Sequence, residues 1–219
     1  MSQMSLFAAG MSDPSFDDLE GLLAGPGSIE RRGDAARVSV LVADGWRAEV
    51  LLRGLSALGP GAQAEACPDG VLVQTPLVPQ LCAVAQRWFS PAGKHAPAGL
   101  RVDGARLWWW CIAAGGGDSA GYRLGLGRAD GDEVWSAAGA ALATAGVTAA
   151  LVGRGQRAAE GPAYRVVGAR RLVRLAELVG AAPQGVPPAA WPTVGQPHVG
   201  MAQPPGIRAA GNYGDPSPS

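Results

Sequence analysis

The chain has 219 residues, enough for one domain or two small ones, and it is 47% hydrophobic but only 16% charged. This balance excludes a chain that is disordered over most of its length. The net charge is zero, but residues 1–90 carry −4 and residues 91–182 carry +4. A partner with phosphate groups would therefore bind the positively charged second half more favourably than the negatively charged first half.

Residues 1–14 are expected to form a flexible N-terminal arm. Ser15-x-x-Asp18 resembles a capping box and opens a short helix, which Gly25-Pro26-Gly27 ends. Turn and period signals then predict two strands, a helix, two strands and a helix, at residues 28–32, 37–43, 46–58, 63–67, 71–75 and 79–89. This first half spans residues 15–90.

Residues 91–105 are rich in Pro, Gly and Ala and are typical of a linker. The same order of elements then recurs in a second half, residues 106–180, with elements at 106–113, 122–127, 132–145, 148–153, 163–167 and 170–179. From residue 181 to 219 the chain shows no periodicity and is dominated by Pro, Gly and Ala, so we expect a disordered tail.

The two halves share a sequence pattern as well as an order of elements. Arg37-x5-Ala43-Asp44-Gly45 leads into an apolar helix, and Arg123-x5-Ala129-Asp130-Gly131 does the same 86 residues later. A duplicated unit cannot bury its apolar face alone. We therefore expect an α+β fold in which two pseudo-symmetric ββαββα repeats form an antiparallel, saddle-like sheet with helices on one face.

A short segment adds a family resemblance to this topology. The run Leu19-Glu20-Gly21-Leu22-Leu23-Ala24-Gly25-Pro26-Gly27-Ser28-Ile29 is similar to the motif helix of the LAGLIDADG homing endonucleases and to its exit. In the second copy, Ala98-Gly99-Leu100-Arg101-Val102-Asp103-Gly104 retains an Asp-Gly. The resemblance implies metal-dependent DNA cleavage between two motif carboxylates. Pro26 stands at one of these positions, which leads us to expect a non-cleaving derivative without metal or cofactor, comparable to LAGLIDADG-derived bacterial transcription regulators.

The run Arg106-Leu107-Trp108-Trp109-Trp110-Cys111-Ile112 supplies the main candidate site. On a strand, Arg106, Trp108 and Trp110 share one face. Arg123 and Arg165 alternate with apolar neighbours and would join this face, with Arg154 near a strand end. Arginines and indoles suit backbone phosphates and stacked bases, at about 1–3 kcal/mol per stacked base. In the alternative interpretation, the tryptophans belong to the core or to the seam between the halves.

Other polar residues allow two interpretations each. Five arginines near strand ends and on the last predicted helix form either a phosphate clamp or a solvated face: Arg154, Arg157, Arg170, Arg171 and Arg174. Asp44 and Asp130, equivalent in the two repeats, form either a paired acidic site or two ordinary turns before helices. The two histidines lie in the expected linker and tail, so no catalytic pair or histidine metal site is visible.

The function expected from these residues is non-enzymatic binding of nucleic acid, either DNA or a single strand, in a regulatory role. The alternative is a protein-interaction module that uses the tryptophan-rich face and the acidic first half. No apolar run reaches the length of a membrane-spanning helix, about 18 residues or more. The three cysteines are widely spaced and read as buried thiols in a reducing compartment. We therefore expect a cytoplasmic protein without membrane contact.

Overall fold

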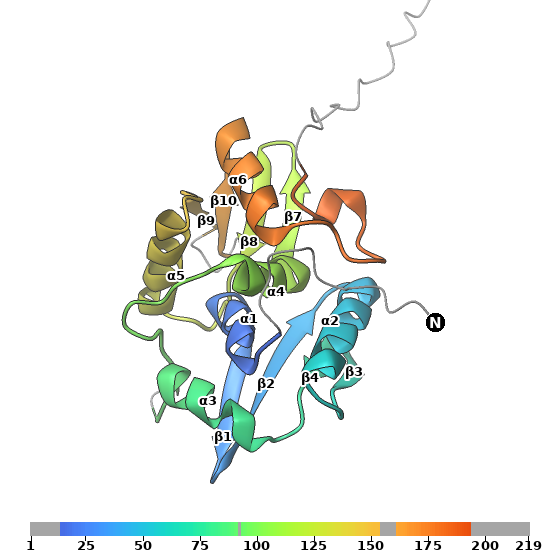
Figure 1. The fold of residues 1–219 in the computed structure, drawn as a ribbon. Coiled ribbons are helices and arrows are strands. Elements are labelled where there is room, and N and C mark those ends of the chain that lie inside the picture. Colours follow the sequence, from blue (N-terminus) through green and yellow to red (C-terminus); the bar gives the residue numbers. More distant parts are fainter. Residues whose placement is uncertain (1–13, 92, 154–160, 194–219) are drawn as a thin grey trace, which may run out of the picture.

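The computed structural model describes residues 14–91, 93–153 and 161–193, and its elements form two halves of the same order (Figure 1). A 3-10 turn (Phe16–Leu19) leads directly into the first helix of the first half. The elements of this half are α1 (Glu20–Ala24), β1 (Ser28–Arg32), β2 (Ala35–Val42), α2 (Gly45–Leu58), β3 (Gln63–Cys67), β4 (Gly70–Gln74) and α3 (Cys82–Trp88). A two-stranded hairpin, β5 (Phe89–Ser90) and β6 (Gly93–Lys94), follows.

The second half repeats this order from its own leading helix. Its elements are α4 (Gly104–Ala114), β7 (Gly115–Asp118), β8 (Gly121–Gly125), α5 (Asp132–Thr144), β9 (Ala150–Val152), β10 (Ala163–Val166) and α6 (Ala169–Val179). Both four-stranded sheets are antiparallel and have matching strand orders, β1-β2-β4-β3 and β7-β8-β10-β9. The predicted α+β class with two pseudo-symmetric repeats is therefore confirmed, and the second repeat has a leading helix like the one predicted for the first.

The prediction of a strand at residues 106–113 is wrong, because these residues form α4. Asp103 caps the helix, its carboxylate accepting the backbone N–H of Arg106 at 3.0 Å. All side chains from Leu107 to Ala113 are buried. A segment that is apolar on every side shows neither a helical nor a strand period, and its tryptophans favour strands in isolation. Burial on all sides selects the helix here.

The same correction concerns the second copy of the motif. Asp103-Gly104, which was expected within the linker, lies at the beginning of α4. The glycines at 115–117, which lie between the strands predicted at 106–113 and 122–127, form most of β7.

The helices α1 and α4 lie side by side at the centre of the molecule, where the two halves meet (Figure 1). Gly21 allows this approach, because a Cβ at this position would overlap the backbone carbonyl of Arg106. Trp110 is fully buried, and its indole N–H donates to the carbonyl of Gly125 at 2.7 Å. The core therefore runs from one half into the other through these two helices.

Each sheet has one buried face and one polar face. In β2, Val38, Val40 and Val42 are buried, whereas the alternate residues are exposed or half-buried. The same alternation along β8 buries Tyr122 and Leu124. The helices cover the buried side, and among the residues that the structure describes none covers the opposite side of either sheet, which is called the uncovered face below.

The connecting and terminal segments differ from expectation. The expected linker at 91–105 contributes β6 and the first residues of α4, and it buries Ala96 and Val102. The expectation of disorder from residue 181 is wrong for residues 181–193, because Trp191 is 3% exposed and donates to the carbonyl of Gly180 at 2.9 Å. Residues 1–13 of the expected arm and 194–219 of the expected tail lie outside the described residues.

Candidate nucleic-acid interface

Two arginines lie opposite each other on the uncovered face of the second sheet. Arg123 in β8 and Arg165 in β10 are cross-strand partners, and both are half-buried. Their chain neighbours Tyr122, Tyr164 and Val166 point into the core. The alternation predicted for these two strands is thus confirmed, and it presents two guanidinium groups side by side on one face.

Asp118 holds one of these arginines. Its carboxylate forms an ion pair with the guanidinium of Arg165 at 2.6 Å and accepts the backbone N–H of Ala120 at 2.8 Å. Burial raises the pKa of Asp118, but the hydrogen bond from the Ala120 amide and the interaction with Arg165 together lower it by more. The pKa of Asp118 therefore lies below its ordinary value. Arg165 is therefore oriented by a carboxylate that stays ionised at neutral pH.

The first sheet presents a different chemistry on its uncovered face. A row of four cross-strand neighbours carries uncharged hydrogen-bonding groups: Ser28, Ser39, Gln74 and Gln63. The hydroxyl groups of Ser28 and Ser39 lie 2.9 Å apart. Hydroxyl and amide groups of this kind match the donor and acceptor groups at base edges.

A hollow of about 710 Å³ opens at the seam between the two halves. The first half contributes Pro26, the end of β2, Asp44, Arg47 and Asp69. The second half contributes residues 113–118, Arg123, Gly125, Leu126, Arg128, Gly161 and Pro162. Much of the second-half wall is glycine and alanine backbone, so a ligand can approach the main chain closely there.

A guanidinium group closes the C-terminal end of α4. Arg47, in α2 of the first half, donates to the carbonyls of Cys111 at 3.3 Å, Ile112 at 2.7 Å and Gly115 at 2.6 Å. It also forms an ion pair with Asp44 at 3.0 Å, and its side chain is only 12% exposed. The Arg47 guanidinium thus binds the carbonyl of Ile112 in the last turn of α4 and shares the carbonyl of Cys111 with the backbone N–H of Gly115.

An ammonium group closes the C-terminal end of α1 in the same manner. Lys94, the one lysine of the chain, donates to the carbonyls of Gly25 at 3.1 Å and Gly27 at 2.8 Å. It forms an ion pair with Asp130 at 2.6 Å, and both side chains are 10% exposed. Burial lowers the pKa of Lys94, and the charge of Asp130 raises it in part.

Asp44 and Asp130 therefore share a role that neither sequence interpretation contained. Each carboxylate holds a cation, Arg47 or Lys94, against the central helix of the opposite half. Sequence reasoning missed both cations because each lies more than 60 residues from the carbonyls that it binds. The repeated Asp-Gly was the available signal, together with the solitary lysine.

The divalent metals that the family resemblance implies do not fit these helix ends. The residues after α1 and α4 are Gly25, Pro26 and Gly115, none of which bears a carboxylate, and carbonyls at both ends are engaged by side-chain cations. Within the described parts of the chain, no cluster of three or more His, Cys, Asp and Glu side chains has a metal-binding arrangement.

Three of the six predicted site residues are not on the sheet face. Trp108 and Trp110 lie in α4, at 8% and 0% exposure. Arg106 lies in the same helix and forms ion pairs with Glu20 at 3.1 Å and Asp103 at 2.7 Å. They were misplaced because a strand was assumed where a helix forms. Arg123 and Arg165 lie together as predicted, and Arg154 lies outside the described residues.

The same correction removes the surface on which the alternative function depended. The three adjacent tryptophans of α4 are buried between the halves, as the alternative interpretation of this run proposed. The described chain therefore presents no tryptophan-rich sheet face to a protein partner.

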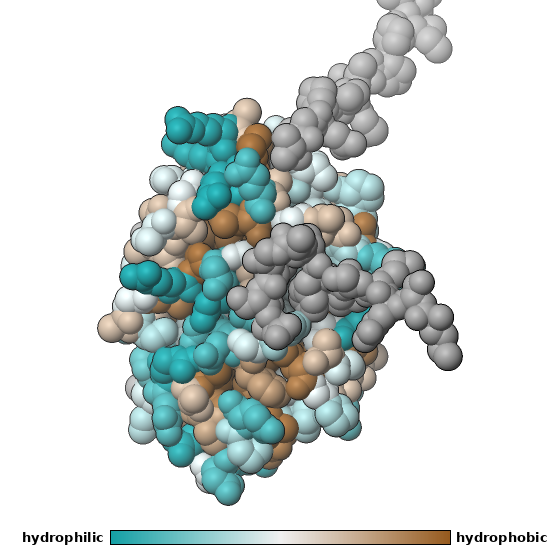
Figure 2. Space-filling view, viewed as in Figure 1, coloured by the Kyte–Doolittle hydropathy of each residue, from teal (hydrophilic) through white to brown (hydrophobic). Residues whose placement is uncertain are grey.

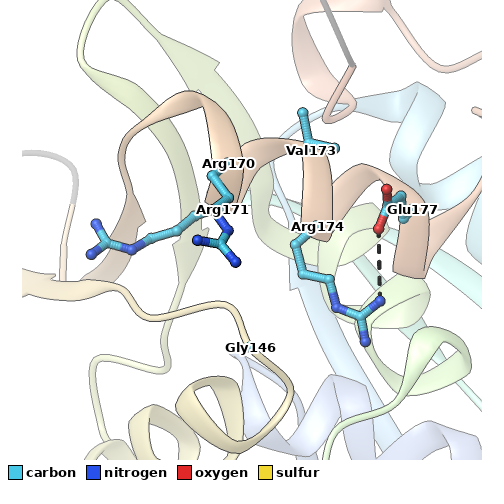
Figure 3. A pocket seen from close by; sticks show the side chains of 6 residues that line it. All are labelled: Gly146, Arg170, Arg171, Val173, Arg174 and Glu177. Atoms are coloured by element: carbon cyan, nitrogen blue, oxygen red, sulfur yellow. Dashed lines mark ion pairs between the residues drawn. The ribbon is translucent and has the colours of Figure 1, made fainter.

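A second group of arginines lies on α6, on the helical side of the molecule. Hydrophilic residues gather over this helix at the top of Figure 2, and the close-up in Figure 3 shows Arg170, Arg171 and Arg174 around a shallow hollow. Arg174 donates to the carbonyl of Ala145 at 3.3 Å and lies 3.7 Å from Glu177. These side chains are exposed, as expected of a solvated helix face, and Arg157 of the same predicted group lies outside the described residues.

No protein-family model matches the chain, and no curated protein matches its sequence. Its structure is similar to that of the homing endonuclease I-WcaI, solved bound to its DNA recognition sequence. The TM-score is 0.54 at 12% sequence identity, over 74% of this chain and 78% of that chain. This likeness confirms the LAGLIDADG-like fold expected from the sequence.

The same comparison corrects one expectation. We expected a chain that is not an enzyme, and this is contradicted because the solved protein of similar fold is an endonuclease.

In the part of the chain that the structure describes, no helix is both long and apolar enough to span a bilayer.

Proposed function

We propose that the protein binds duplex DNA on the uncovered face of its two sheets. The observation that carries the proposal is the cross-strand pair Arg123 and Arg165, which lies on that face beside the seam hollow. Guanidinium groups bind phosphate and guanine edges through paired N–H donors. The fold is shared with a protein solved on its DNA, which supports the same use of the surface here.

The two halves contribute different contacts in this proposal. The second half supplies charge through Arg123, Arg165 and Arg128. The first half supplies the uncharged row from Ser28 to Gln63, which suits base edges. A duplex that lies across both sheets would therefore meet phosphate-binding and base-reading groups at different positions along its length.

The test is a salt titration of binding to a fluorescent duplex of about 30 base pairs with a mixed sequence. Affinity should fall steeply with salt, because each phosphate contact releases counterions. Arg123→Ala and Arg165→Ala should each weaken binding and make the slope of log K against log salt shallower by about 1. Arg170→Ala, on the helical side, is the matched control and should leave both quantities unchanged.

Two results would contradict the proposal. The first is an absence of binding at low salt, where even non-specific contacts are detectable. The second is a slope that changes in Arg170→Ala but not in the two sheet variants, which would place the DNA on the helices.

A further inference from the structure

The two central helices end in sites that are built for a cation. A helix C-terminus carries about half a negative charge, concentrated on its last carbonyls. Just after α1, the carbonyls of Gly25 and Gly27 share Lys94 with the carboxylate of Asp130. At the end of α4, carbonyls share Arg47 with the carboxylate of Asp44. Carbonyl and carboxylate oxygens are the ligands that hard divalent cations also take.

We infer that Lys94 and Arg47 are built-in cations that take the place of bound metal ions at these two helix ends. The Lys94 ammonium has three donors and three oxygen partners, namely Gly25, Gly27 and Asp130. Arg47 uses four donor contacts, to Asp44 and to three carbonyls of α4 and the residue after it. Both cations are thus held in place without an external ligand.

The repeat symmetry is an independent reason for this inference. Asp44 and Asp130 are equivalent positions in the two halves, and each holds a cation against the opposite half's helix. The cations themselves come from unrelated places, α2 for Arg47 and the β6 hairpin for Lys94. Two different side chains that reach matching positions indicate that the requirement is for positive charge at the site.

These cations have a consequence that rests on the proposed function. Both helix ends lie at the seam, where Pro26, Arg47 and Gly115 line the hollow on the proposed DNA face. Without a cation, the carbonyls at these helix ends and the carboxylate of Asp44, which also lines the hollow, would repel phosphates there. With Lys94 and Arg47 in place, DNA binding should need no divalent ion.

The sharpest test is to remove the ammonium and offer a metal in its place. Lys94→Ala leaves two carbonyls and the Asp130 carboxylate without their cation, and it should lower Tm by about 10 °C in EDTA. Millimolar Mg²⁺ or Ca²⁺ should restore much of this loss in the variant and leave the wild type unchanged. The double variant Lys94→Ala, Asp130→Asn lacks the charged ligand and should show no recovery.

A Tm of Lys94→Ala that does not respond to divalent ions would overturn the inference, as would an equal response in the double variant. If Lys94→Ala does not fold in EDTA, refolding with and without Ca²⁺ gives the same readout. Arg47→Ala, which exposes the carbonyls of α4 and Asp44, provides the second variant. Glu49→Ala, at an exposed position of the same helix, is its control.

The DNA measurement separates this inference from the proposed function. Wild-type affinity in EDTA should not increase on adding Mg²⁺ at matched ionic strength, whereas Lys94→Ala should bind at least tenfold more weakly in EDTA and recover with Mg²⁺. A wild type that binds only with Mg²⁺ would contradict the built-in cations. A wild type that binds no DNA, together with a metal-rescued Tm in Lys94→Ala, would refute the proposed function alone.

Discussion

Gly21 of α1 packs against the backbone of Arg106 of α4 so closely that a single methyl group would overlap the carbonyl of Arg106. The contact joins the two halves, since α1 belongs to the first and α4 to the second. No side chain could move aside to make room for a Cβ at position 21, because the atoms in the way belong to the main chain of Arg106. The join between the halves therefore depends on the absence of a Cβ at this position.

Gly21→Ala should lower the free energy of unfolding by about 3 kcal/mol or more, because α1 must move away from α4. Gly45→Ala is the matched control, since Gly45 begins α2 with open space around its Cα. That change should be neutral or slightly stabilising. Urea unfolding of both variants measures the difference, and equal stabilities would refute the close packing of α1 on α4.

Asp118→Asn should reduce the acid sensitivity of the fold. The pKa of Asp118 is lower in the folded protein than its ordinary value of about 3.9. Its contribution to stability is therefore present above the ordinary pKa and is lost as the pH falls through the folded pKa. Unfolding by urea at pH 6 and pH 3 should show a smaller loss for the Asn variant than for the wild type. Identical losses would mean that the Arg165 pair does not favour the charged carboxylate.

Trp191→Ala should destabilise the protein by about 3–5 kcal/mol, because a large buried side chain is lost. Trp191→Phe keeps most of the packing but loses the hydrogen bond to the Gly180 carbonyl. It should therefore lower the free energy of unfolding by about 1 kcal/mol relative to the wild type. Thermal unfolding of both variants is the measurement. An unchanged Tm in Trp191→Ala would show that residues 181–193 lie outside the cooperative fold.

The repeat and the order of elements could be predicted because they depend on local signals. The Asp-Gly turns at Asp44 and Asp130 and the alternation around Arg123 are all visible within a few residues. They placed two of the candidate site residues, Arg123 and Arg165, on the correct face.

The central helix α4 could not be predicted in the same way. Its residues are buried on every side, so they carry no amphipathic period, and three consecutive tryptophans favour a strand in isolation. The contacts of Lys94 and Arg47 are long-range, and no local sequence pattern predicts which carbonyl a distant side chain will bind. Both failures concern the junction of the halves, where tertiary packing decides the conformation.

The position of DNA on the uncovered sheet face can be read directly from the native cysteines. Cys67 ends β3 with its side chain on that face, Cys82 begins α3 in the helical layer, and Cys111 is fully buried, where burial raises its pKa to about 12. The measurement is the rate of thiol modification at each cysteine, with and without a saturating duplex. DNA bound on the uncovered sheet face should slow modification of Cys67 at least tenfold and leave that of Cys82 unchanged, while Cys111 stays unreactive. Protection of Cys82 with continued modification of Cys67 would contradict DNA binding on that face.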